Sequence, residues 1–158
     1  MNESERGRNA LALSRRPDGE GDDVVSAVDV FVDRARARIS LVDMSQAAQL
    51  RMSGALLIDI RPDSQRRQFG QIPNALTIER NVLEWRLEPG GGHRHPAVVE
   101  HDGPIIVFCQ EGYASSLAVA SLVDLGVREV HDLTGGFRAW KEAGLPTEHH
   151  AELQSVNS

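Results

Sequence analysis

The sequence predicts an α/β fold in which a central, mostly parallel sheet is flanked by helices, with an extra helix at the N-terminus. Three observations lead to this fold class. The chain has 158 residues, enough for one hydrophobic core and too few for two ordinary domains. Short apolar runs of strand length alternate with segments of helical periodicity, as in parallel sheets with helical crossovers. Glycines and prolines stand between these segments.

The N-terminal part is predicted to contain a leader and a helix. Residues 1–22 carry five acids and four arginines around a short Ala-Leu run, so we expect a disordered leader. Apolar side chains recur at helical spacing from about residue 23 to 38, with an N-cap signal at Asp22 and Asp23 and arginines near the carboxyl end. We therefore assign residues 23–40 to an N-terminal helix.

The next segments predict helix, strand, helix and strand in turn. Ser45 is expected to cap a short helix over residues 46–52. Residues 55–60 form an apolar run with one acid between a glycine and a proline, which favours a buried strand. A helix over residues 63–69 and a short strand at 75–78 follow.

Asn81 is then expected to cap a helical turn. The stretch 88–103 has no hydrophobic periodicity and is predicted to be a surface loop. His93 and His95 lie in this loop without further ligands at suitable spacing, so no metal site is expected there.

The C-terminal half contains the clearest strand, over residues 104–108. It is followed by a helix over residues 115–125 that Gly126 ends. A strand at 127–133 leads to a helix that opens at residues 135–136, and Phe137 and Trp140 of this helix are expected in the core.

Composition excludes several classes of protein. A net charge of −6 argues against nucleic acid as a partner. No stretch approaches the roughly 20 apolar residues of a membrane span, and the N-terminus lacks a signal-peptide pattern, so we expect a cytoplasmic protein. One cysteine excludes an intramolecular disulfide and a zinc site built on several thiolates. No cofactor is expected.

That cysteine, Cys109, is the candidate nucleophile. It directly follows a predicted strand, at the sheet edge where strand carboxyl ends meet helix amino ends. Gly112 lets the next residues turn tightly with their N–H groups inward, and Ser115 or Ser116 can cap the next helix. Such surroundings stabilise a thiolate. The alternative is that Cys109 is a small core residue at a strand end.

Four motifs follow one another in the chain: Leu-Ile-Asp-Ile-Arg at 57–61, Gly-Gln-Ile-Pro-Asn-Ala at 70–75, Cys-x-x-Gly at 109–112, and Gly-Gly-Phe at 135–137 with Trp140 and Gly-Leu-Pro at 144–146. In this order they resemble a single rhodanese domain over residues 41–146. The resemblance implies a three-layer α/β domain over 41–147 and transfer of sulfane sulfur through a persulfide on Cys109. The residues after it, 148–158, are predicted to form a loose tail.

The resemblance also implies which residues bind the substrate, namely the loop after the nucleophile. A carboxylate in this loop would repel an anionic donor such as thiosulfate. Two positions depart from the family pattern: Gln71 replaces the usual His, and Asn74 replaces a Gly, a mild change because Asn tolerates the same turn. The loop residues are Gln110, Glu111, Gly112, Tyr113, Ala114 and Ser115.

Four charged residues are candidates for supporting roles. Asp59 and Arg61 alternate along a strand and its exit, so they point to one side; an ion pair that anchors the loops is favoured over a charge at the mouth of the site. Arg80 and Arg86 follow the second strand, where they could meet an anionic donor or form a solvated helix face.

The predicted function is transfer of sulfur from a small donor (thiosulfate, a persulfide or a polysulfide) to cyanide or a thiol acceptor, such as glutathione or a thioredoxin-like protein. The alternative is a non-catalytic or sulfur-carrying interaction module, with the N-terminal helix as a candidate homodimer surface. A phosphatase or arsenate reductase is disfavoured, because those enzymes need an Arg six residues after the cysteine, where this chain has Ser115.

Overall fold

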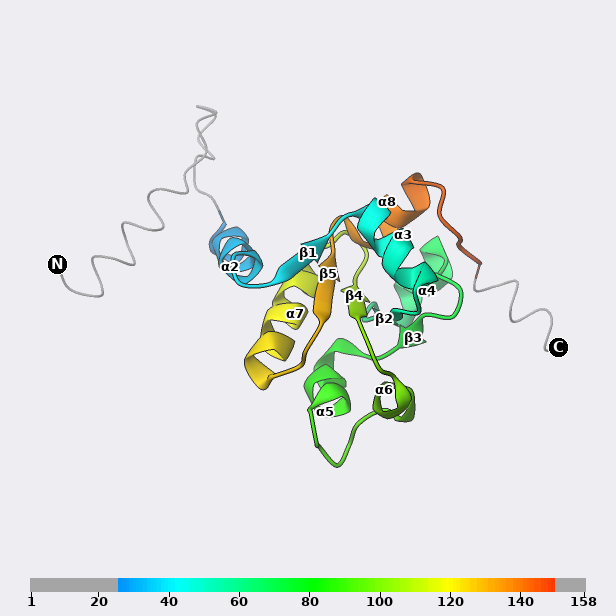
Figure 1. Cartoon of the computed structure of the whole chain (residues 1–158). Coiled ribbons are helices and arrows are strands. Elements are labelled where there is room, and N and C mark those ends of the chain that lie inside the picture. Colours follow the sequence, from blue (N-terminus) through cyan, green and yellow to red (C-terminus); the bar gives the residue numbers. More distant parts are fainter. Residues whose placement is uncertain (1–25, 150–158) are drawn as a thin grey trace.

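A five-stranded parallel sheet forms the centre of the computed structural model, which describes residues 26–149 (Figure 1). The strand order is β1-β5-β4-β2-β3, and every strand pair is parallel. The fold class predicted from the alternation of strands and helices is therefore confirmed. The strands are β1 (Ser40–Val42), β2 (Leu56–Asp59), β3 (Leu76–Thr77), β4 (Ile105–Phe108) and β5 (Val130–Leu133).

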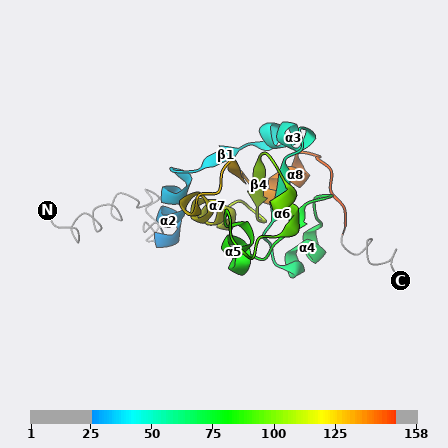
Figure 2. The ribbon, with the colours of Figure 1, turned by 60° about the horizontal axis from the view of Figure 1, so that its bottom comes forward.

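Helices cover both faces of this sheet (Figure 2). The strand side chains alternate between two buried clusters: Ile58 and Val107 pack with α5, α6 and α7, whereas Leu57 and Ile106 pack with α3 and α8. The N-terminal helix α2 packs outside the sheet against α7. The helices are α2 (Ala27–Arg36), α3 (Met44–Met52), α4 (Asp63–Phe69), η1 (Arg80–Val82), α5 (Leu83–Leu87), α6 (Pro96–Glu100), α7 (Ala114–Leu125) and α8 (Gly136–Glu142).

The N-terminal helix is shorter than predicted. It begins at Ala27, and Ser26 is its N-cap because the Ser26 hydroxyl accepts a hydrogen bond from Val28 N. The predicted cap at Asp22 and Asp23 and the predicted leader lie outside the described residues. Strand β1 occupies part of the segment that we assigned to the helix. Three residues are too few to show a strand period, and this strand exists through its pairing with β5.

Three predicted helix caps are wrong. Helix α3 begins at Met44, capped by Asp43 in a capping box with Gln46, rather than by Ser45. Asn81 lies inside η1 instead of capping a helix. Ser115 lies in the first turn of α7, whose N-cap residue makes no side-chain capping bond.

The predicted loop 88–103 contains a helix. His95 caps α6 by accepting a hydrogen bond from Ala97 N, and Pro96 at the first helical position supports the start. Five residues with a single buried side chain, Val98, carry too little periodicity to be recognised in the sequence.

The C-terminal segment departs from the predicted loose tail at its first residue. Glu148 pairs with Gln71 through two backbone hydrogen bonds of 2.8 Å in an antiparallel bridge. Residues 150–158 of the tail lie outside the described residues. Within residues 26–149, no helix is long and apolar enough to cross a membrane.

Candidate active site

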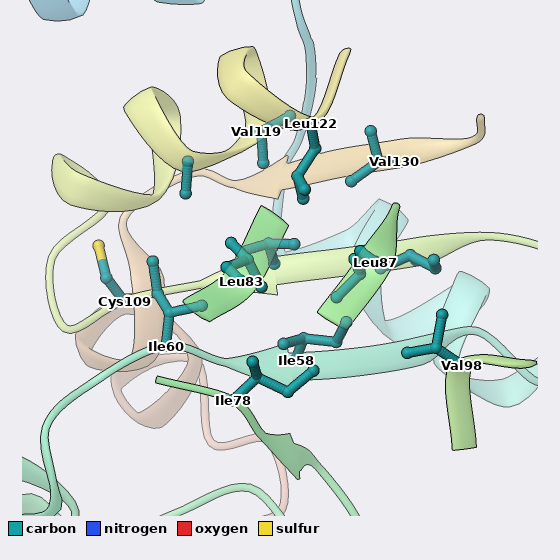
Figure 3. Packing of buried hydrophobic residues seen from close by; sticks show 13 residues of the cluster. Ile58, Ile60, Ile78, Leu83, Leu87, Val98, Cys109, Val119, Leu122 and Val130 are labelled. Carbon is teal, nitrogen blue, oxygen red and sulfur yellow. The ribbon is translucent and has the colours of Figure 1, made fainter. Parts of the chain in front are cut away.

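Cys109 lies at the carboxyl end of the central strand β4, where the sequence placed it. It is 7% exposed and forms one end of the hydrophobic cluster under α7 (Figure 3). Its sulfur accepts hydrogen bonds from two backbone groups of the following loop, Gly112 N at 3.2 Å and Ser115 N at 3.3 Å. The predicted turn of N–H groups towards the sulfur is therefore present.

The loop that provides these donors is packed against the start of α8. Phe137 N donates to the Cys109 carbonyl at 2.9 Å, and Arg138 N donates to the Gln110 carbonyl at 3.0 Å. Gly112 has φ +91°, and a Cβ there would lie 2.8 Å from the Gly135 nitrogen. A glycine is therefore required on both conformational and steric grounds.

A buried carboxylate lies behind the sulfur. Ser115 Oγ donates to Asp132 Oδ1 and Ser116 Oγ to Asp132 Oδ2, each at 2.6 Å. Ser115 Oγ also lies 3.3 Å from the Cys109 sulfur. Burial raises the pKa of Asp132, and this effect outweighs the two serine hydrogen bonds and the charge of Arg36, which lower it.

Sequence reasoning did not single out Asp132. The carboxylate stands in a short strand far along the chain from the loop, and neither its spacing nor its neighbours mark it. The two serines predicted as caps are instead the donors that satisfy this carboxylate.

Arg36, at the end of α2, reaches the same loop from outside the predicted domain. Its Nη2 donates to the Gly112 carbonyl at 2.8 Å and its Nε to Ser116 Oγ at 3.0 Å. The guanidinium also lies 5.4 Å from the ring centroid of Tyr113, which is exposed. In the sequence Arg36 is one of three arginines near a helix end, and its role follows from the packing of α2 on α7.

Asp59 and Arg61 form a buried ion pair, as favoured from the sequence. The two side chains are 1% and 0% exposed, with Arg61 Nη2 2.8 Å from Asp59 Oδ2. Arg61 also donates to the Gln110 side chain at 2.9 Å and to the Gly70 carbonyl at 2.8 Å, and it stacks on the Phe137 ring at 4.2 Å. The pair therefore holds the loop in place through Gln110.

The structure gives Arg80 and Arg86 contacts elsewhere. Arg80 pairs with Glu84 on the next helical turn at 2.8 Å, and Arg86 donates to the His93 carbonyl at 2.9 Å. Neither of these contacts brings the guanidinium to the loop after Cys109.

The acidic residue of the loop has a cationic neighbour that the sequence did not reveal. Glu111 and Arg138 are both exposed, and their charged groups lie 3.4 Å apart. A pocket of about 350 Å³ opens beside them between the loop and α8, with Phe69 and Phe137 as its apolar walls and Lys141 among its charged residues. The surface beside the loop therefore carries both signs of charge. Among residues 26–149, no group of three His, Cys, Asp or Glu side chains is placed to hold a metal ion.

Comparisons with known proteins identify the family of this fold. Residues 43–143 match the model of the rhodanese-like domain family. The thiosulfate sulfurtransferase GlpE of Ectopseudomonas mendocina is 34% identical over 107 residues, which cover 68% of this chain and 88% of the relative. The crystal structure of a thiosulfate sulfurtransferase from Pseudomonas aeruginosa superposes with a TM-score of 0.57 and 25% identity over 71% of this chain and 20% of that one.

A further solved structure carries a different description. A protein of unknown function from Rhodopseudomonas palustris, described as a possible tyrosine phosphatase, superposes with a TM-score of 0.70 and 28% identity. The match covers 79% of this chain and 96% of that one, so it extends beyond the segment that matches the family model.

Proposed function

Because this chain belongs to the rhodanese-like family of single-domain sulfurtransferases, we propose that it transfers sulfane sulfur through a persulfide on Cys109. The observation that carries the proposal is the pair of backbone N–H groups, from Gly112 and Ser115, directed at the sulfur of Cys109. Such donors stabilise the thiolate that attacks and the anionic persulfide that results.

The loading step balances without a cofactor. The Cys109 thiolate attacks the outer sulfur of the donor, and a new S–S bond forms as the bond from that sulfur to the rest of the donor breaks. The electron pair leaves with the remainder, as sulfite from thiosulfate or as a thiolate from a persulfide. The product is Cys109–S–S⁻, held by the loop residues 110–115.

Release of the sulfur requires a second molecule. Cys109 is the one cysteine in the chain, so no neighbouring thiol of this protein can resolve the persulfide. A small thiol such as glutathione, a thioredoxin-like protein, or cyanide in an assay would accept the outer sulfur. The cytoplasm, where thiols stay reduced, suits this chemistry.

Intact mass after incubation with thiosulfate or glutathione persulfide tests the proposal. We expect the wild-type chain to gain the mass of one sulfur atom and to lose it on addition of cyanide. We expect Cys109→Ser to gain no sulfur. Absence of the gain with every donor, or its persistence in Cys109→Ser, would contradict the proposal.

The second candidate is a non-catalytic or sulfur-carrying interaction module. It is favoured by two large apolar side chains on α2, Phe31 and Val28, which are 61% and 56% exposed. In this case the chain would form a homodimer or bind a partner through α2. Sedimentation of the wild type and of Phe31→Ser, together with the sulfur-loading assay, distinguishes the two hypotheses. A dimer that is lost in Phe31→Ser and a wild type that takes up no sulfur would favour the interaction module over the enzyme.

Tyrosine phosphatase activity has weaker support. Phosphate clamps use a guanidinium in the loop after the cysteine, and residues 110–115 contain no arginine. We expect no hydrolysis of an aryl phosphate under conditions in which Cys109 is loaded with sulfur. Turnover that disappears in Cys109→Ser would restore the phosphatase reading.

A further inference from the structure

The polar chain behind the sulfur links two groups that can each hold a proton. The thiol of Cys109 lies 3.3 Å from Ser115 Oγ, and Ser115 Oγ lies 2.6 Å from Asp132 Oδ1. All three residues are buried, and Asp132 is 1% exposed. Water therefore has little access to the carboxylate, and Ser115 lies directly between it and the sulfur.

The hydrogen bonds between Cys109, Ser115 and Asp132 can form in two arrangements, which differ in whether Asp132 is ionised or protonated. With an ionised Asp132, the thiol donates to Ser115 Oγ, and the serine hydroxyl donates to the carboxylate. With a protonated Asp132, the carboxylic acid donates to Ser115 Oγ, and the serine hydroxyl donates to an anionic sulfur. In the second arrangement the sulfur has three donors, because the hydroxyl joins the N–H groups of Gly112 and Ser115.

We infer that Asp132 is a positioning residue for the chemistry at Cys109, exchanging one proton with the cysteine through Ser115 so that negative charge rests on either the carboxylate or the sulfur. The proton leaves the thiol for Ser115 Oγ as the serine's own proton passes to Asp132 Oδ1. It returns by the same route when an acceptor thiolate removes the outer sulfur and the electron pair of the broken S–S bond falls back to Cys109. No oxidant or additional reactant is needed.

The surroundings of Asp132 support this role. Burial disfavours its ionised form and so raises the pKa of Asp132, which makes the protonated carboxylic acid more accessible than at an exposed aspartate. The charged side chain that acts on Asp132 is Arg36 of α2, which donates to Ser116 Oγ and opposes the effect of burial by lowering the pKa of Asp132. The paired neighbours in the sheet, Leu41 of β1 and Val107 of β4, carry no charge.

The single cysteine makes the coupling directly measurable. Every thiol alkylation by iodoacetamide occurs at Cys109, so the alkylation rate against pH reports the population of its thiolate. For a coupled pair, we expect the wild-type rate to rise in two steps, since the pair loses two protons in sequence. A single ionisation step in the wild type would overturn the inference without any variant.

Three variants assign the coupling to Asp132. Asp132→Asn removes the charge of the carboxylate and its titration, so we expect the alkylation rate of Cys109 to rise in one step. The midpoint of this step should lie about one pH unit lower than in the wild type, and alkylation below the midpoint should be roughly tenfold faster. Ser115→Ala retains the carboxylate charge and removes the hydroxyl donor, so its midpoint should move to higher pH. The matched control, Ser116→Ala, removes the other hydrogen bond to Asp132 and should keep two steps.

The midpoint of alkylation should shift to lower pH in Asp132→Asn and to higher pH in Ser115→Ala, and these opposite shifts distinguish coupling from a structural role. If Asp132 and Ser115 only supported the loop, both substitutions would loosen the sulfur site and displace the midpoint in the same direction, and that result would overturn the inference. Circular dichroism confirms that each variant is folded; if Asp132→Asn is not, the wild-type profile and Ser115→Ala still decide.

The use of this proton in sulfur transfer rests on the proposed function, but the alkylation experiment does not. Coupling without sulfur loading would contradict the proposed function alone. Sulfur loading with a single-step profile would contradict the inference alone.

Discussion

Arg61 Nη1 donates to the side-chain oxygen of Gln110 across 2.9 Å, and this contact ties the exit of β2 to the loop that holds Cys109. The same guanidinium is paired with Asp59 and is fully buried. One side chain therefore anchors two sheet-edge segments that are 49 residues apart in the chain.

Arg61→Ala should destabilise the fold strongly. It leaves the Asp59 carboxylate buried without its partner, for which we expect a loss of about 3–5 kcal/mol in the free energy of unfolding. Urea denaturation measures this loss. Arg67→Ala is the control, because Arg67 forms an exposed ion pair with Asp63 and should change the free energy by about 0–1 kcal/mol. Equal effects of the two substitutions would contradict the anchoring role.

Arg36→Ala should slow the loading of sulfur onto Cys109. The substitution removes the two hydrogen bonds of Arg36 to the Gly112 carbonyl and Ser116 Oγ, which help to fix the N–H donors of the loop. We therefore expect loading to slow by roughly ten- to a hundredfold. Stopped reactions analysed by intact mass give the rate. Arg38→Ala is the control, because Arg38 follows α2 and pairs with Asp124 of α7, away from the loop. A rate in Arg38→Ala as low as in Arg36→Ala would show that α2 acts only by packing.

Removal of the charge of Glu111 should favour anionic donors. Glu111→Gln removes the negative charge of the loop after Cys109 and leaves Arg138 paired with Glu142 alone, so loading from thiosulfate should be about two- to fivefold faster at low salt. Arg138→Ala removes the cation and should slow loading. Both effects should shrink as salt is added, because exposed charges are screened. Glu100→Gln on α6 removes an equal charge from an exposed position outside the loop and should not change the rate. A donor rate that is insensitive to both substitutions would exclude electrostatic selection here.

Stability should fall in mild acid through His131. Burial lowers the pKa of this histidine below its ordinary 6.5, while the charge of Glu129 opposes the change. The neutral imidazole is therefore the form that the fold favours, and the stabilisation present above pH 6.5 is lost as the pH falls through the folded pKa. Urea midpoints at neutral and mildly acidic pH should differ less in His131→Gln than in the wild type. An equal acid sensitivity would assign the effect to other groups.

Local patterns in the sequence predicted most of the fold. The strand at residues 104–108 and the helices that end at glycines have patterns that lie within consecutive residues. Whether each segment is a strand or a helix could therefore be inferred without knowledge of the packing. The errors concern short elements. Strand β1 and helix α6 have three and five residues, and each is stabilised by contacts with distant segments more than by its own pattern.

For the site, the sequence by itself determined the position of the candidate nucleophile and of its loop. Cys109 follows a strand, Gly112 permits the turn, and both features are local. Only the tertiary structure decided what surrounds the sulfur. Arg36 and Asp132 reach the loop from α2 and β5, and in the sequence each is one charged residue among many. Their roles depend on burial and on distances between elements, which arise when the helices pack against the sheet and bring distant residues into contact.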